Sequence, residues 1–211
     1  MSDYRVAVLL SGGGSNLQAL LDAQDAGALT CEIVCVIADR ADAYGLQRAL
    51  GRGLSCACVP LPRAPVAERA AVRAAWEVRL AAVLAAFAPD LVLLSGFMRV
   101  LSADFLGRFP LVINQHPALL PDDGGATVVS GDGTAIPALR GAHVVPEALR
   151  RGLPLTGATI HIATPQLDDG PILARAEVPI RTDDTEATLH ERIKTEERRM
   201  VVEVVARLAA R

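Results

Sequence analysis

The chain has 211 residues, of which 51% are hydrophobic, 21% are charged and only 3% are aromatic, and its formal net charge is −3. This composition is typical of a well-buried globular protein and excludes a disordered one. The length suits one large domain or two small ones, and no segment resembles a linker. A net negative charge argues against a broad nucleic-acid-binding surface, but it allows an anionic small molecule held by a few local donors.

No stretch is apolar for long enough to span a membrane, and residues 1–5 lead into a strand-like run without the layout of a signal peptide. The four cysteines, Cys31, Cys35, Cys56 and Cys58, lack the C-x-x-C spacing of a zinc site. We expect buried free thiols in a reducing cytoplasm, no metal site and no membrane partner.

Strands and helices are predicted to alternate through the first half of the chain. Apolar runs predict strands at 4–10, 32–38, 55–61, 91–94 and 111–113. Helical spacing predicts helices from about 17, at 44–50, at 66–87 and, briefly, at 102–106. Because the strands lack polar alternation, we expect an α/β fold: an open, twisted, mostly parallel, Rossmann-like sheet with helices on both faces.

The pattern changes after residue 121. Residues 122–137 are rich in Gly and Asp, contain no Lys or Arg, and are predicted to form a mobile loop. A short helix is expected at 146–151, with proline at its start. Strands are expected at 156–163 and 171–178, and one long helix at about 185–210.

A glycine loop, Gly12-Gly13-Gly14-Ser15-Asn16, lies between the first predicted strand and helix. Unpaired amides at a helix N-terminus attract anions, and glycine lets the backbone approach a phosphate. Leu17 replaces the third glycine of a dinucleotide loop, and no Walker lysine follows. A phosphate site and a tight turn capped by serine fit this loop equally well, and a monophosphate fits better than a dinucleotide.

Asn114 and His116 lie two residues apart at the end of a predicted strand, so their side chains face the same space. An uncharged donor beside a proton carrier suits an acyl-transfer site. The later Asp168-Asp169-Gly170 segment is either an ordinary acidic turn or part of such a site. His190, on the charged final helix, is interpreted as a structural residue.

Several segments together resemble the phosphoribosylglycinamide formyltransferase family, the folate-dependent enzymes of purine synthesis. They are residues 10–19, 41–46, 95–102, 114–121, 156–161 and 167–171. The Asn-x-His-Pro and Leu-Leu-Pro motifs are shared by the wider formyltetrahydrofolate-using group, whereas the Gly-Ser-Asn loop is specific to the glycinamide ribonucleotide enzymes. The resemblance implies one formyltransferase domain over 1–211, with a phosphate-binding half (1–111) and a catalytic and folate-binding half (112–211).

The resemblance also implies the site residues. The phosphoribosyl group would be held by Gly14, Ser15, Asn16, Lys194 and Glu197, with the glutamate on the ribose hydroxyls. The folate would contact Arg73, Met98, Arg99, Val100, Leu101, Asn114, Thr164, Pro165, Gln166, Leu167 and Asp168. The catalytic residues would be Asn114, His116 and Asp168, with His143 and His161 one layer behind them.

The implied reaction moves the formyl group of the co-substrate 10-formyltetrahydrofolate to the amine of 5′-phosphoribosylglycinamide, in de novo purine (IMP) biosynthesis. Asn114 and a protonated His116 would stabilise the oxyanion. Asp168 would raise the pKa of His116 and take the amine proton through a water. Neither a metal nor a covalent acyl-enzyme is required, and we expect a cytoplasmic monomer or homodimer with small-molecule substrates.

One segment departs from the family pattern. In the family, Pro-Gly-x-His follows Leu-Leu-Pro closely, but here residues 122–140 intervene and Arg140 precedes Gly141-Ala142-His143. We expect the inserted residues to form a longer, disordered loop near the folate, which costs little closure entropy.

The alternative functions for the chain are a formyltetrahydrofolate hydrolase, a transferase of the same fold acting on charged tRNA or a sugar nucleotide, and a phosphate-binding regulatory module on a flavodoxin-like sheet with a silent His116.

Overall fold

The computed structural model describes residues 4–210, in which seven strands form one mixed sheet. The sheet order is β3 (Cys56–Cys58), β2 (Glu32–Ala38), β1 (Arg5–Leu10), β4 (Leu91–Leu94), β5 (Val112–His116), β8 (Leu155–Ile162) and β9 (Ile172–Pro179). The strands from β3 to β5 pair in parallel, and β8 and β9 pair antiparallel. The prediction of an α/β fold with a mostly parallel sheet is confirmed.

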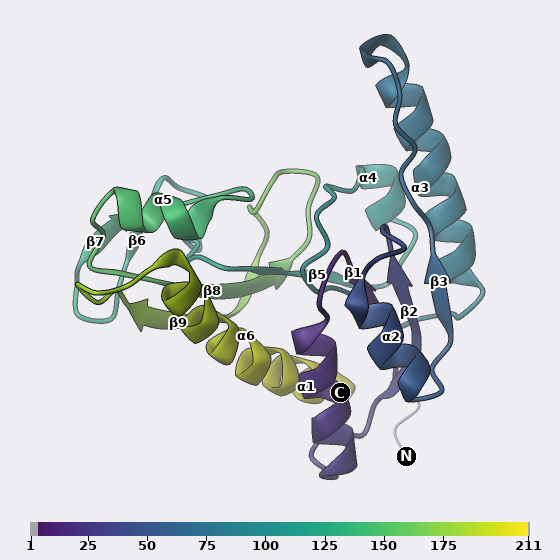
Figure 1. The fold of residues 1–211 in the computed structure, drawn as a ribbon, viewed down its shortest axis with the longest axis horizontal. Coiled ribbons are helices and arrows are strands. Elements are labelled where there is room, and N and C mark those ends of the chain that lie inside the picture. The colour runs from purple at the N-terminus through teal and green to yellow at the C-terminus, as the bar shows by residue number, and fades with distance from the viewer. Residues whose placement is uncertain (1–3, 211) are drawn as a thin grey trace.

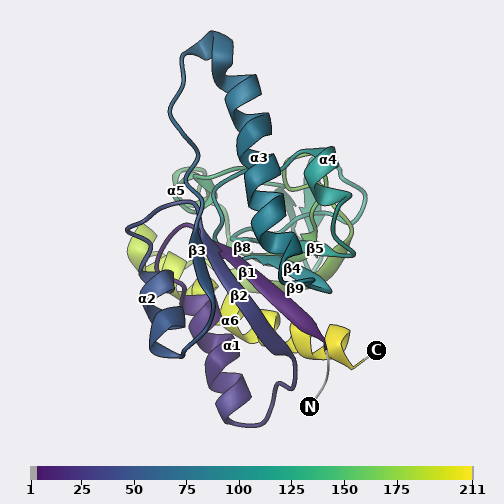
Figure 2. The same cartoon turned by 90° about the vertical axis from the view of Figure 1, so that its right-hand side faces the viewer.

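Helices cover both faces of this sheet (Figures 1 and 2). They are α1 (Ser15–Asp25), α2 (Tyr44–Gly51), α3 (Arg69–Ala85), α4 (Ala103–Leu106), α5 (Val144–Arg150) and α6 (Glu186–Ala209). One core cluster packs the sheet against α1, α2, α5 and α6, and a second packs it against α3 and α4. The first turns of α3 stand clear of the body in both views, and Trp76 is its first buried residue.

The central strands are buried on both sides, as their unbroken apolar runs predict. Val6 and Val8 of β1 belong to the first core cluster. Ala7 and Leu9 belong to the second. Successive side chains of a strand point to opposite faces, so a strand covered on both faces needs apolar residues at every position.

The expectation of a disordered loop at 122–137 is wrong, because this segment contains a β-hairpin. β6 (Thr127–Val129) pairs antiparallel with β7 (Ala135–Pro137), and Val128 lies opposite Ile136. Both side chains are buried against Leu119 and Leu155 in a small third core cluster. Val128 and Ile136 are isolated apolar residues in the sequence, and only the strand pairing places them on one face.

Smaller differences concern element boundaries. A 3₁₀ turn, η1 (Val66–Glu68), precedes α3, and β3 covers only residues 56–58 of the strand predicted at 55–61. Pro146 is the third residue of α5 instead of its first, where its missing N–H still costs no helical hydrogen bond.

The four cysteines are free thiols, but not all are buried. Burial raises the pKa of Cys31 to about 11 and that of Cys35 to about 12. Cys56 is half-buried and Cys58 is exposed, so the expectation of burial is wrong for Cys58. In residues 4–210, no helix is long and apolar enough to cross a membrane, and no group of three or more His, Cys, Asp or Glu side chains could hold a metal ion.

Candidate active site at the carboxyl edge of the sheet

A cavity of about 690 Å³ opens where β1, β4 and β5 end. Its walls include the segments that follow these strands, from Gly12, Ser95 and Pro117 onward. Ligands of open α/β sheets collect outside the carboxyl ends of the strands, so the cavity lies where the fold favours a binding site.

The glycine loop forms one end of the cavity and is held from behind by α2. Gly14 has a φ of +69°, and a Cβ there would lie 2.7 Å from the Cα of Gly45, so the position requires glycine. The Gly45 amide donates to the Gly12 carbonyl (3.0 Å), and Nε of Arg48 donates to the Gly13 carbonyl (2.8 Å). With these carbonyls turned toward α2, the first amides of α1 are left for an anion in the cavity.

Arg48 lines the cavity and was not predicted. Its guanidinium also donates to Oε1 of Gln18 (2.9 Å) and lies 5.0 Å from the centre of the Tyr44 ring. It therefore brings a positive charge beside the glycine loop. Nothing in the sequence links it to a loop more than thirty residues earlier.

One face of α6 forms the wall beside the glycine loop, where Lys194 and Glu197 line the cavity as predicted. Burial raises the pKa of Glu197 to about 7, against the charges of Lys194 and Arg198, which lower it. His190 also lines the cavity, and its interpretation as a structural residue stays a prediction. Burial, followed by the Lys194 charge, lowers the His190 pKa. Its spacing of four residues from Lys194, which places both on one helix face, could have revealed it.

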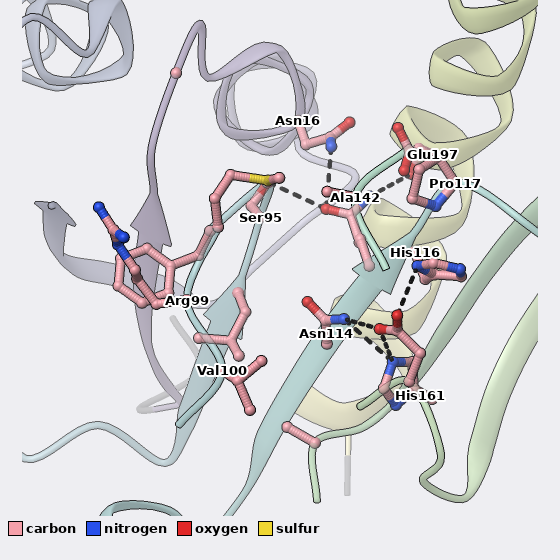
Figure 3. A pocket seen from close by; sticks show the side chains of 18 of the residues that line it. Asn16, Ser95, Arg99, Val100, Asn114, His116, Pro117, Ala142, His161 and Glu197 are labelled. Atoms are coloured by element: carbon pink, nitrogen blue, oxygen red, sulfur yellow. Dashed lines mark hydrogen bonds and ion pairs between the residues drawn. The ribbon is translucent and has the colours of Figure 1, made fainter. Parts of the chain in front are cut away.

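Gln115 connects the glycine loop to β4 and α6 and was also not predicted. Its Oε1 accepts hydrogen bonds from Nδ2 of Asn16 (3.0 Å) and from Oγ of Ser95 (3.1 Å), and its Nε2 lies 3.5 Å from the Glu197 carbonyl (Figure 3). The side chains of Asn16, Ser95, Gln115 and Glu197 are all buried.

The structure brings Asn114 and His116 (Figure 3) together with Asp168 in the same cavity. Nδ2 of Asn114 lies 3.4 Å from Oδ1 of Asp168, and Nδ1 of His116 lies 3.3 Å from Oδ2. His161, opposite Asn114 in the β5–β8 pairing, places its Nε2 3.2 Å from the Asn114 amide. An amide donor, an imidazole and a carboxylate thus converge within hydrogen-bonding range.

Asp168 is held in a left-handed conformation, with a φ of 50°. Such a conformation is uncommon for a residue other than glycine and persists only where its surroundings enforce it. The Gly141 amide donates to Oδ2 (2.8 Å), and Nε of Arg140 donates to the Asp168 carbonyl (3.1 Å). Arg140 also donates to the carbonyls of Gly124 and Gly125, so it ties the inserted segment to the Asp168 loop.

The prediction that Asp168 keeps His116 cationic is wrong. The Asp168 charge and the Leu139 carbonyl act to raise the His116 pKa, but burial outweighs them and lowers it. For Asp168, burial acts to raise the pKa, but the His161 hydrogen bond, the His116 charge and the Gly141 amide together lower it. Asp168 is therefore ionised, and it lies beside the His116 imidazole, whose cationic form readily loses a proton.

The hydrogen-bond partners of His116 indicate which ring nitrogen carries the proton when the imidazole is neutral. Nε2 of His116 lies 2.7 Å from the Leu139 carbonyl, which can only accept, so Nε2 carries the proton. Nδ1 faces Oδ2 of Asp168 at 3.3 Å. A neutral ring in this orientation would accept a proton at Nδ1, beside the carboxylate that stabilises the resulting charge.

The opposite end of the cavity has an apolar mouth. Met98, Val100 and Leu167 line it and are 60%, 41% and 49% exposed. Arg99, Leu101, Thr164 and Gln166 also line this end, and Nε of Arg99 is bound by Oδ2 of Asp39 (2.5 Å). Exposed apolar side chains around a few polar groups suit a flat heterocyclic ligand.

Comparisons with known proteins agree with this geometry. The formyl transferase family profile matches residues 4–205. The chain is 41% identical to phosphoribosylglycinamide formyltransferase from Mycobacterium tuberculosis, over 97% of this chain and 85% of that protein. It is 33% identical to the same enzyme from Escherichia coli, over 91% and 81%. The crystal structure of glycinamide ribonucleotide transformylase 1 from Symbiobacterium toebii matches with a TM-score of 0.84 at 36% identity, over 99% of this chain and 89% of that one.

The chain belongs to the phosphoribosylglycinamide formyltransferase family. The resemblance that its motifs predicted is confirmed.

Three residues that the family resemblance implied do not line the cavity within residues 4–210: Arg73, His143 and Pro165. Arg73 lies on α3, with Nε 3.4 Å from Oε1 of Glu77, and His143 is the N-cap residue of α5. Pro165 lies between Thr164 and Gln166, which do line the cavity. Their roles in this formyltransferase family member stay predictions.

Proposed function

We propose that this chain transfers the formyl group of 10-formyltetrahydrofolate to the amine of 5′-phosphoribosylglycinamide, in de novo purine biosynthesis. The observation that carries the proposal is one cavity that is lined by Asn114, His116 and Asp168, by an anion-type glycine loop and by an apolar mouth. Family membership supports the reaction, and the geometry supports the role of each residue.

The phosphoribosyl group binds at the glycine loop. The backbone amides of Gly14, Ser15 and Asn16 and the ammonium of Lys194 hold the phosphate, because a helix N-terminus and a nearby cation both favour an anion. The Glu197 carboxyl accepts hydrogen bonds from the ribose hydroxyls.

The folate binds at the apolar mouth. The segment from Met98 to Leu101 forms one wall, and the segment from Thr164 to Leu167 forms the other. The N10 formyl group then lies at the centre of the cavity, beside Asn114.

The amine nitrogen attacks the formyl carbon, a C–N bond forms, and the carbonyl electron pair moves to the oxygen. The Asn114 amide donates to this oxyanion, and one such donor is worth about 2.7–4 kcal/mol of barrier in a comparable acyl transfer. Nδ1 of His116 takes the amine proton, and the ionised Asp168 stabilises the imidazolium formed, which joins Asn114 in stabilising the oxyanion. The same proton then passes to N10, the C–N10 bond breaks, and the carbonyl re-forms. No step requires a metal or a covalent acyl-enzyme.

We further propose one formyltransferase domain over 1–211, acting in the cytoplasm as a monomer or homodimer. Strands of one sheet come from residues 5–179, which supports a single unit. The cavity takes Gly14 and Met98 from 1–111, and His116 and Lys194 from 112–211. Each half therefore contributes residues to the cavity, and Gly14 and Lys194, one from each half, both belong to its proposed phosphoribosyl end.

The test is turnover of the purified chain with 10-formyltetrahydrofolate and phosphoribosylglycinamide, followed by the absorbance change on folate release. We expect turnover in the wild type and none above background in His116→Ala. Equal rates in the two proteins would contradict the proposal. Folate release without the amine would indicate a hydrolase instead.

A further inference from the structure

The Asp168 loop (residues 164–170) is not held by hydrogen bonds between backbone groups. Among residues 4–210, no backbone–backbone hydrogen bond involves residues 164–170, and the nearest ones on the N-terminal side are made by the amides of Ile162 and Ala163. Asp168 nevertheless keeps a φ of 50°, a conformation that persists only where the surroundings enforce it. Side chains or backbone groups from outside the loop must therefore fix the position of Asp168.

Arg140 supplies such contacts through its guanidinium. Its Nε donates to the Asp168 carbonyl (3.1 Å), and its Nη2 donates to the carbonyls of Gly124 (3.1 Å) and Gly125 (3.0 Å). The same Nη2 lies 3.6 Å from Oδ1 of Asp169. Because a guanidinium is planar and presents its donors in a rigid fork, these contacts fix the distance between the Asp168 loop and residues 124–125.

The residue after Arg140 holds the other end of Asp168. The Gly141 amide donates to Oδ2 of the carboxylate (2.8 Å), while Arg140 binds the carbonyl of the same residue. The two segments also pack closely, since a Cβ at Gly124 would lie 2.6 Å from Oδ1 of Asp169. A displacement of Arg140 would therefore change both the backbone and the carboxylate position of Asp168.

The inserted segment is a firm support for these contacts. Its hairpin, β6 and β7, buries Val128 and Ile136 in the third core cluster, and Nη2 of Arg175 on β9 binds Oδ2 of Asp122 (2.7 Å). Arg140 does not line the cavity within residues 4–210, so its guanidinium is not placed to contact a substrate there. Arg140 can thus act on the reaction only through its neighbours.

We propose that Arg140 is a positioning residue that fastens the Asp168 loop to the inserted segment and so keeps the Asp168 carboxylate beside His116. This inference rests on the proposed function and refines it. The inserted residues, which depart from the family pattern, then serve the chemical step by supporting the loop that carries its carboxylate.

The charge of Arg140 offers a second route to the same reaction. Burial lowers the pKa of His116, and the charges of His161 and Arg140 lower it further, against the opposing charge of Asp168. A lysine at position 140 would keep a positive charge there, but a single ammonium cannot reproduce the fork that joins three carbonyls. The two routes are therefore separable by substitution.

The test begins with Arg140→Met, which keeps most of the side-chain length and removes the fork. We expect kcat to fall about 30-fold, because a small misplacement of a reacting group is costly. The KM values for phosphoribosylglycinamide and for the folate should stay within about twofold of wild type. Arg150→Met, at a side chain 70% exposed on α5 and paired with Glu147, is the matched control and should change neither constant.

Arg140→Lys should lose kcat to the same extent as Arg140→Met, because the fork and not the charge is required. Wild-type kcat in Arg140→Lys, or an unchanged kcat in Arg140→Met, would overturn the inference.

A double-mutant cycle shows whether Arg140 acts through Asp168. In an Asp168→Asn background, Arg140→Met should reduce kcat by no more than about threefold further, because residues that act through one another are not additive. The full loss in this background would mean that Arg140 supports the fold in general, and it would overturn the inference.

Two provisions keep the test decisive. If Arg140→Met does not fold, as judged by circular dichroism, Arg140→Lys carries the test, and its loss of kcat must likewise shrink in the Asp168→Asn background. Absence of turnover in the wild type would count against the proposed function, whereas wild-type turnover that Arg140→Met leaves unchanged would count against the inference alone.

Discussion

The two ends of the cavity are lined by different kinds of chemical group. At the end that we assign to the phosphoribosyl group, the available groups are chiefly backbone amides of one continuous segment, Gly12 to Asn16, which runs from the end of β1 into the first turn of α1. At the formyl-transfer end they are side chains from β5 and from the loop after β8, more than fifty residues apart. The first end depends on local backbone geometry, whereas the second depends on how distant segments pack.

The two ends of the cavity also differ in their electrostatic requirements. The glycine loop attracts an anion through a helix N-terminus and nearby cations, which needs no unusual protonation state. At the other end, burial sets the charge of His116 against the influence of Asp168. Changes at this second end should therefore act on rate, and changes at the first end on substrate affinity.

The largest effect is expected for Asp168→Asn. Loss of the carboxylate should reduce kcat by about 100- to 1,000-fold, because the imidazolium formed on His116 loses its counter-charge. It should also lower the His116 pKa further, since the Asp168 charge acts to raise it. Steady-state kinetics and the pH dependence of kcat measure both effects. Asp169→Asn, at the exposed neighbouring position, is the control.

The affinity of Asp168→Asn for phosphoribosylglycinamide should stay within about twofold of wild type, because the glycine loop is untouched. A parallel loss of affinity, measured by calorimetry, would mean that the two ends are not separable.

An intermediate effect is expected for Ile136→Ala in the hairpin. Truncating this buried side chain should lower the free energy of unfolding by about 2 kcal/mol, because it leaves a cavity against Leu119 and Leu155. Val129→Ala, at a position 66% exposed on β6, should change the free energy of unfolding by less than about 0.5 kcal/mol. Urea denaturation measures the free energy of unfolding of both variants. Equal values for Ile136→Ala and Val129→Ala would support a disordered loop at 122–137 instead.

The smallest effect is expected for Arg48→Met. Removing the guanidinium that holds the Gly13 carbonyl should raise the KM for phosphoribosylglycinamide by about fivefold and leave kcat unchanged, since hydrogen bonds to charged groups contribute modestly. Arg52→Met, one helical turn further on and paired with Asp25, should leave both constants unchanged. A fall in kcat for Arg48→Met alone would show that the glycine loop also influences the chemical step.

Sequence reasoning succeeded where structure is local. The apolar runs of β1 and β4 predicted strands buried on both faces, and the glycine loop was placed correctly between a strand and a helix. It failed for Val128 and Ile136, whose burial depends on a hairpin that brings them onto one face. Arg48 and Gln115 were missed because their partners lie far along the chain, beyond the reach of any periodic pattern.

By itself, the sequence determined the α/β class, the family and the positions of Asn114, His116 and Asp168, because periodicity and motifs are properties of short segments. Only the tertiary structure decided that these three side chains meet, that Gln115 is hydrogen-bonded to Asn16, and that the His116 pKa is lowered. Burial and long-range hydrogen bonds set these properties, and both arise only when segments distant in the chain pack together.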